Sequence, residues 1–193
     1  LHDKAMGGSG NMKERVKLLS DALNAQRQIL IDVIKKPANE IPQAFTPYKE
    51  VLDVYNAGLE LPDDVTIIWP DDNYGYMKRL SSPKEQKRSG RSGVYYHSSY
   101  LGKPHDHLWM NTVSPTLMYE ELRKAYDATA DRIWLLNAGD IKSCEFAVDY
   151  FLTMAFDIDA FNFERAANYR TEWLCGMLGD QYRNEYQDVV NSF

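Results

Sequence analysis

Two carboxylates in this 193-residue sequence follow apolar runs that have the character of β-strands. Glu50 comes soon after the run that ends at Phe45, and Asp71 comes just after the β-branched run that ends at Trp69. Two carboxylates that face each other across a cleft suit general acid–base chemistry, because one donates a proton while the other activates a water. Hydrolysis of a glycosidic bond uses such a pair, and either residue can be the acid.

Amide and aromatic side chains that can hold a polar ligand lie at the same strand ends. Tyr95 and His97 alternate along one run and therefore point to the same side of a strand, with Tyr100 just beyond it. Asn73 follows Asp71, and Asn137 ends the last apolar run, where an amide can donate to a carboxylate or a hydroxyl.

Each of these residues also has a purely structural interpretation. Glu50 fits the first turn of a helix, where the helix dipole favours an acid that faces solvent. The Asp-Asp-Asn-Tyr-Gly run that begins at Asp71 fits an ordinary turn. A single histidine such as His97 is more often a hydrogen-bonded structural residue than a catalyst. Both interpretations stay open for each residue.

A second cluster consists of His105, Asp106 and His107, with His97 nearby in the sequence. Imidazole and carboxylate groups bind metals, so this cluster would indicate a metal-dependent hydrolase or deacetylase. The sequence has no helical HExxH motif to support it, and we predict no metal and no cofactor.

Strand and helix patterns alternate along the first 156 residues. Strands are predicted at 42–45, 65–69, 94–96 and 131–136, and helices at 12–34, 47–58, 115–125 and 145–156. This alternation indicates an α/β fold with a parallel sheet, whose loops converge at the carboxyl ends of the strands. The Lys-, Arg-, Ser- and Gly-rich segment 84–93 is predicted to be a loop, either solvated or attractive to an acidic substrate.

Polar residues at four strand ends favour a partial TIM-like (β/α) barrel over a doubly wound sheet. We expect residues 1–156 to be the C-terminal portion of a barrel catalytic domain. Residues 157–193 show only helical patterning and are expected to begin a helical bundle domain. Half a barrel leaves strand edges uncovered, so we also expect further strands upstream of Leu1 in a longer chain.

Composition narrows the range of partners. The formal net charge of −6 argues against a nucleic-acid partner, which needs a basic face. No apolar run is long enough to span a bilayer, so no membrane partner is predicted. Cys144 and Cys175 lack the spacing of a zinc site and are expected to be free thiols.

Three segments of the sequence resemble glycoside hydrolase family 115, the xylan α-1,2-glucuronidases. They are LPDDVTIIWPDDNYGYMKRL, RSGVYYHSSYLGKPHDHLWMNT and YDATADRIWLLNAGDIKSCEF. The resemblance covers nearly the whole chain in the same order, from the HDKAMGGSG loop into the helical segment after Phe156. It implies a multidomain protein of which this chain matches the later part of the catalytic barrel and the start of the helical bundle.

The resemblance also implies an activity: hydrolysis, with inversion, of (4-O-methyl-)glucuronic acid linked α-1,2 to the xylose backbone of glucuronoxylan. It implies Glu50 and Asp71 as the catalytic carboxylates; we take Glu50 as the acid and Asp71 as the base, an assignment that the sequence leaves reversible. The residues that would hold the uronic acid are Asn73, Tyr95, His97, Tyr100 and Asn137. The family's pocket also uses an arginine and other groups from upstream strands, so this chain alone is expected to be inactive.

The partners implied by the resemblance are glucuronoxylan or aldouronic oligosaccharides, the remaining domains of the parent chain, and a second copy in a homodimer. The implied location is secreted or periplasmic. Two other function classes stay open: a carbohydrate-binding module that has the pocket without turnover, and the metal-dependent hydrolase of the histidine cluster.

Overall fold

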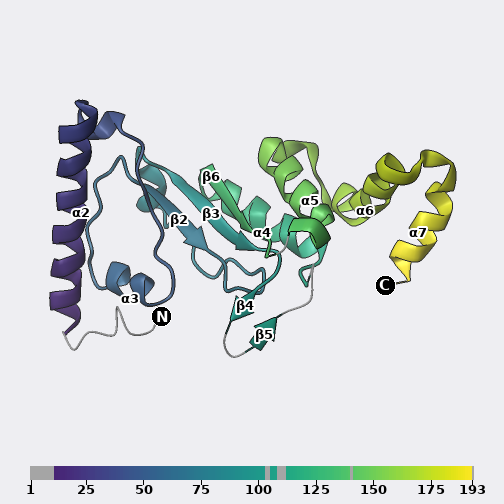
Figure 1. Cartoon of the computed structure of the whole chain (residues 1–193), viewed down its shortest axis with the longest axis horizontal. Coiled ribbons are helices and arrows are strands. Elements are labelled where there is room, and N and C mark those ends of the chain that lie inside the picture. Colours follow the sequence, from purple (N-terminus) through teal and green to yellow (C-terminus); the bar gives the residue numbers. More distant parts are fainter. Residues whose placement is uncertain (1–10, 103–104, 108–111, 140, 193) are drawn as a thin grey trace.

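The computed structural model describes residues 11–102, 105–107, 112–139 and 141–192, and for residues 101, 102, 105–107 and 143 it describes the backbone alone. A β-sheet lies at the centre of an elongated molecule (Figure 1). Helix α2 (Met12–Ile34) lies at one end of it, and helices α6 (Phe163–Leu178) and α7 (Arg183–Asn191) lie at the other.

Four parallel strands form the central sheet, in the order in which they occur along the chain. They are β1 (Ala44–Phe45), β2 (Thr66–Pro70), β3 (Ser92–His97) and β6 (Ala130–Asn137). Every residue of β2 is buried, as expected for a strand inside a parallel sheet. The register puts Tyr95 beside Leu135 and His97 beside Asn137. The four predicted strands and their parallel arrangement are therefore confirmed.

Strand β3 begins inside the segment that the sequence predicted to be a loop. The prediction was wrong for Ser92 and Gly93, which belong to the strand, and for Glu85–Lys87, which form a 3₁₀ turn. A Cβ at Gly93 would lie 2.1 Å from the carbonyl oxygen of Ile133 in β6. Here the glycine permits the close approach of two strands. Composition alone does not distinguish such a strand glycine from a loop glycine.

The remaining helices are α3 (Glu50–Asn56), α4 (Pro115–Asp127) and α5 (Glu145–Phe156). The predicted N-cap of α4 is confirmed, because the Ser114 side chain accepts a hydrogen bond from the Leu117 N–H. Helix α3 begins three residues later than predicted. Lys49 has φ 52° and ψ −123°, a non-helical conformation that prevents the helix from starting before Glu50.

A short antiparallel pair, β4 (Leu101–Gly102) and β5 (His105–His107), was not predicted. The side chains of the predicted histidine cluster at 105–107 lie outside the described residues, so that hypothesis stays untested. In the described part of the chain, no group of three or more His, Cys, Asp or Glu residues is arranged to hold a metal ion.

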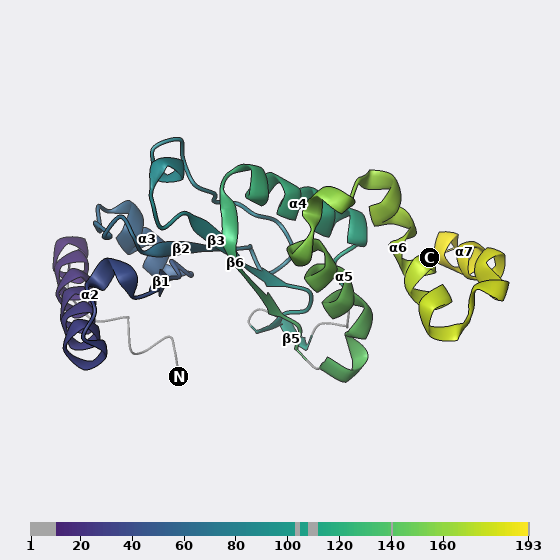
Figure 2. The ribbon, with the colours of Figure 1, turned by 90° about the horizontal axis from the view of Figure 1, so that it is seen from above.

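Helices α4 and α5 pack beside β6, and both views show them on one side of the sheet (Figures 1 and 2). The sheet residues buried in the same core as these helices are Ile67, Trp69, Val94 and Tyr96, with Trp134 and Leu136 packed against them. Alternate residues point to the other face, which therefore carries Tyr95, His97, Leu135 and Asn137. Leu135 is 46% exposed on that face.

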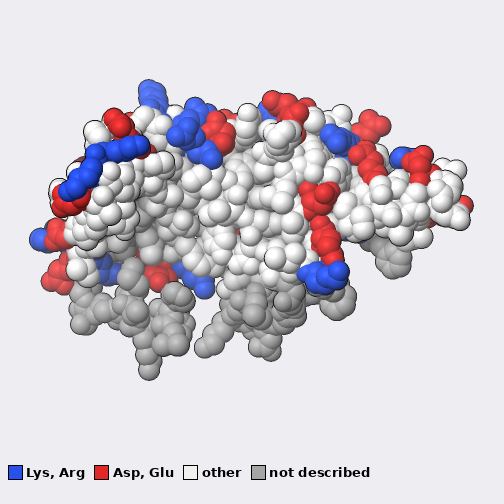
Figure 3. Space-filling model, turned by 45° about the horizontal axis from the view of Figure 1, so that its top comes forward, with Lys and Arg blue, Asp and Glu red and all other residues white. Residues whose placement is uncertain are grey.

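Charged side chains of both signs are interspersed on the surface seen in Figure 3, and no continuous basic patch forms there among the described residues. None of the described helices combines the length and the apolar character needed to cross a membrane. Cys144 and Cys175 are both buried and neither forms a disulfide, as predicted.

Candidate active site

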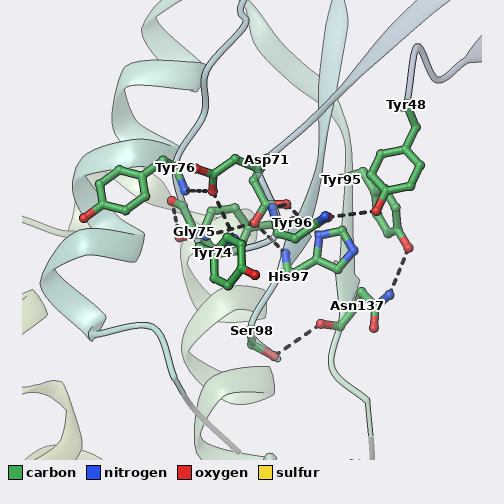
Figure 4. A network of polar contacts seen from close by, with 12 residues as sticks. Tyr48, Asp71, Tyr74, Gly75, Tyr76, Tyr95, Tyr96, His97, Ser98 and Asn137 are labelled. Atoms are coloured by element: carbon green, nitrogen blue, oxygen red, sulfur yellow. Dashed lines mark hydrogen bonds and ion pairs between the residues drawn. The ribbon is translucent and has the colours of Figure 1, made fainter. Parts of the chain in front are cut away.

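The carboxyl ends of the strands bring most of the predicted site residues into one network of contacts (Figure 4). The residues that share it are Asp71, Asn73, Tyr95, His97, Tyr100 and Asn137. Tyr48, which was not singled out in the sequence, joins this network. Glu50 follows Tyr48 by two residues and makes no hydrogen bond or ion pair with any described residue.

The turn after β2 is built around two aspartates. The Asp71 carboxylate accepts the backbone N–H groups of Asn73 and Gly75, and the Asp72 carboxylate accepts those of Tyr74 and Tyr76. Asn73 has φ 70°, which asparagine tolerates better than most residues. The turn interpretation of this segment is therefore confirmed. It does not exclude a role in the site, because the turn also fixes where Asp71 points.

Asp71 reaches across to the end of β3 and binds His97 twice. Its Oδ1 lies 2.6 Å from the His97 Nδ1, and its Oδ2 accepts the His97 backbone N–H at 3.1 Å. The exposed fraction of the side chain is 0% for Asp71 and 2% for His97. This is a buried carboxylate–imidazole pair at the centre of the network.

Tyrosine rings enclose the imidazole of His97. Tyr48 stacks against it at 6.2 Å between ring centroids, and Tyr95 lies at 4.7 Å. Tyr100 meets it edge-on at 5.6 Å. Burial, followed by the neighbouring Tyr100 phenol, raises the pKa of Tyr48 to about 12, so this hydroxyl stays a hydrogen-bond donor across the neutral range.

Hydrogen bonds fix the orientation of two side-chain amides. The Tyr48 hydroxyl donates to the Asn73 Oδ1 at 2.8 Å. The Asn137 Nδ2 donates to the Tyr95 hydroxyl oxygen at 2.9 Å, while its Oδ1 accepts the Gly139 N–H at 3.3 Å. The acceptor atoms of both amides are thus used within the protein. The Asn73 Nδ2 and the Tyr95 O–H are left as donors for a ligand.

Tyr48 and Lys49 lie in the loop between β1 and α3 and were not predicted as site residues. The Lys49 ammonium lies 5.3 Å from the centroid of the Tyr48 ring and adds a positive charge beside that ring. Their position directly before Glu50 was the available signal. The contacts of Tyr48 with residues at the ends of β2 and β3 depend on the fold and leave no pattern in the sequence.

Comparisons with known proteins identify the family of this chain. The profile of glycosyl hydrolase family 115 matches residues 1–193. The chain belongs to glycosyl hydrolase family 115. The predicted family is therefore confirmed.

A solved family 115 structure resembles the chain along almost its whole length. It is described as a novel family GH115 4-O-methyl-α-glucuronidase, BtGH115A, with specificity for decorated arabinogalactans. It is 40% identical, with a TM-score of 0.90 over 96% of this chain, which spans 24% of the length of that chain. A comparison with curated proteins finds no match.

Proposed function

We propose that this family 115 chain supplies part of the active site of a glycoside hydrolase that removes glucuronic acid, or its 4-O-methyl ether, from an α-1,2 linkage to xylan. The observation that supports the proposal is the set of tyrosines and amide donors grouped around the buried Asp71–His97 pair at the strand ends. Aromatic rings cover the apolar face of a sugar, and amide and phenol donors bind its oxygens.

The donors suit an acidic sugar in particular. Because the acceptor atoms of Asn73 and Asn137 are used inside the protein, the side chains offer mainly N–H and O–H groups to the ligand. Glucuronic acid presents a carboxylate and several hydroxyl oxygens that accept such groups. The ammonium of Lys49 beside Tyr48 adds a favourable charge.

We assign the role of general acid to Glu50. It is partly buried at the start of α3 and has no hydrogen-bond partner among the described residues, so its carboxyl group is free to meet a leaving oxygen. Asp71 remains the second carboxylate of an inverting mechanism. Because its side chain is fully buried, it acts through His97 rather than by direct contact with a water.

The sheet also supports the proposal of a barrel. Parallel sheets are normally covered on both faces, yet the helices in the described part of the chain pack on the face opposite Tyr95 and His97. In a (β/α) barrel this second face lines the interior, with polar groups at the carboxyl end. We propose that residues 1–156 are part of such a barrel and that 157–193 begin a helical bundle.

A second polysaccharide is a specific alternative to xylan. BtGH115A is described as acting on decorated arabinogalactans, and it is 40% identical to this chain. The common feature of both candidates is a terminal glucuronic acid, which the strand-end residues would bind. The polymer beyond the sugar would contact residues farther out, so the choice between the two polymers is a matter for experiment.

The test uses the whole protein that carries this sequence, incubated with glucuronoxylan and with glucuronic-acid-decorated arabinogalactan. We expect release of (4-O-methyl-)glucuronic acid, with the β-anomer detected first by ¹H NMR because inversion changes the configuration. Binding without release would instead support a carbohydrate-binding module. Loss of activity in chelator would support the metal-dependent alternative. An α-anomer formed first would contradict inversion.

A further inference from the structure

The carboxylate of Asp71 has no free position for a ligand. Its Oδ1 contacts the Asn73 N–H and the His97 Nδ1, and its Oδ2 accepts the N–H groups of Gly75 and His97. A carboxylate has about four acceptor positions, and all are used here. With a side chain that is 0% exposed, Asp71 cannot touch a sugar or a water in this conformation.

The contact between Asp71 and His97 determines which ring nitrogen carries the proton. At 2.6 Å, the Asp71 Oδ1 and the His97 Nδ1 must share a hydrogen, because two lone pairs at that distance would repel each other. The Asp71 oxygens act as acceptors in their other three contacts, all with backbone N–H groups. The proton therefore belongs on Nδ1.

The other ring nitrogen of His97 is left as a hydrogen-bond acceptor. Its Nε2 has no hydrogen-bond partner among the described residues. This atom is also absent from the set of completely buried side-chain nitrogen and oxygen atoms without a partner, so it is not completely buried. The imidazole lies between Asp71 and Tyr95 (Figure 4). The rings of Tyr48, Tyr95 and Tyr100 pack around it, so it has little freedom to rotate away from Asp71.

We propose that Asp71 is a positioning residue: it holds His97 with the proton on Nδ1, so that Nε2 accepts a hydrogen bond from an O–H group in the bound complex. That O–H belongs either to the sugar or to the water that attacks it. The inference rests on the proposed function for its ligand, but the tautomer itself is a property of the free protein.

The kinetic test compares two variants of the same turn in the whole protein, Asp71→Asn and Asp72→Asn. Both substitutions keep the side-chain shape and affect a carboxylate that accepts backbone N–H groups. Only Asp71 contacts His97. We expect Asp71→Asn to lower the activity by about 10³–10⁴-fold, because its amide would donate to the Nδ1 and move the proton to Nε2. Asp72→Asn should stay close to wild type, and equal losses in both would overturn the inference.

The spectroscopic test needs no variant to be active. In ¹⁵N-histidine-labelled protein, long-range ¹H–¹⁵N spectra distinguish a protonated from an unprotonated ring nitrogen. The sequence has four histidines, and the signals of His97 are those missing from His97→Gln. We expect a protonated Nδ1 and an unprotonated Nε2 in the wild type, with the reverse in Asp71→Asn. An unprotonated Nδ1 in the wild-type protein would overturn the inference even if Asp71→Asn fails to fold.

These tests separate the inference from the proposed function. If the expected tautomer is found but no glucuronic acid is released from any substrate, the positioning role stands and the function fails. If glucuronic acid is released but the Nδ1 of His97 is unprotonated, the proposed function stands and the positioning role of Asp71 fails. In an active enzyme, a loss confined to kcat in Asp71→Asn would identify the attacking water as the partner of Nε2, whereas a loss confined to KM would identify a sugar hydroxyl.

Discussion

Glu50 and Asp71 are both carboxylates at strand ends, but their surroundings give them different tasks. Asp71 is fully buried and bonded on both oxygens. Glu50 is partly buried and has no hydrogen-bond partner among the described residues. A group that must gain and lose a proton directly with a ligand cannot be fully buried, and of these two side chains only Asp71 is fully buried.

We therefore predict that Glu50→Gln lowers glucuronic acid release by roughly 10³-fold or more without reducing stability, since the amide cannot donate the proton of an acid and no described contact is lost. Rates and thermal unfolding of the whole protein would be compared with Asp53→Asn, an exposed acid in the same helix. Near-normal rates in Glu50→Gln would move the acid to residues outside this chain.

The sequence indicated most of the site residues but not how they pair. Acid, amide and aromatic residues after strand-like runs were enough to select His97 and Asn137. Asp71 and His97 are 26 positions apart, and their contact exists only because β2 and β3 are neighbours in a particular register. Tyr48 lacked a signal of its own, because its role comes from stacking on a residue of another strand.

At the scale of elements, the segment between β2 and β3 is organised by one carboxylate. Glu85 accepts two hydrogen bonds from Arg79, one from the Tyr55 hydroxyl in α3 and one from the Ser82 N–H. Arg88 in the same segment donates to the backbone carbonyl of Pro62. Arg88 of the basic segment therefore serves the structure of the fold through this contact.

We predict that this carboxylate contributes to acid sensitivity. Burial alone would raise the pKa of Glu85, but the hydrogen bonds from Arg79, Ser82 and Tyr55 outweigh it and lower the pKa to about 2. Because the folded value lies below the unfolded one, the stabilisation is present above about pH 4.5 and is lost as the pH falls towards 2.

The measurement is urea unfolding of wild type and Glu85→Gln between pH 6 and pH 2.5. The stability difference between the two proteins should shrink as the pH falls. Glu60→Gln, at an exposed carboxylate with no hydrogen bond among the described residues, should show no such dependence. A difference between wild type and Glu85→Gln that stays constant with pH would contradict the prediction.

Glycines give a second test at this scale, because two of them have opposite surroundings. A Cβ at Gly93 would lie 2.1 Å from the Ile133 carbonyl oxygen, so Gly93→Ala should push β3 and β6 apart and cost about 1–3 kcal/mol. Gly176 lies within α6 with nothing within 4 Å of its Cβ position, so Gly176→Ala should stabilise that helix by about 0.5–1 kcal/mol.

Hydrogen exchange measured by mass spectrometry would resolve both effects locally. Peptides from β3 and β6 should exchange faster in Gly93→Ala, and peptides from α6 should exchange more slowly in Gly176→Ala. Unchanged exchange in β3 and β6 would mean that the two strands are not held as closely as described. The strands and most helix limits followed from periodicity and caps, whereas the close approach at Gly93 requires the paired strand to be known.

At the scale of the whole molecule, the described helices cover one face of the sheet, and the other face has no such cover and is exposed along β6. The first is buried by α4 and α5, and the second carries Tyr95 and His97 at its carboxyl end, with Leu135 beside Tyr95. Leu135 is 46% exposed, and the chain spans only 24% of the length of BtGH115A. If the sheet is part of a barrel, the exposed face is an interior, and its apolar residues are buried in the whole protein.

Substitution of Leu135 tests this arrangement. We predict that Leu135→Lys destabilises the whole protein by about 2–5 kcal/mol, because it would place a charge among packed side chains of a barrel interior. Asn56→Lys adds the same charge at an exposed site on α3 and should change stability by less than about 0.5 kcal/mol. In the isolated 193-residue chain Leu135 faces solvent, so Leu135→Lys should aggregate less than Asn56→Lys there. Equal thermal stability of the two variants in the whole protein would show that this face of the sheet stays in contact with water, and the barrel would have to be abandoned.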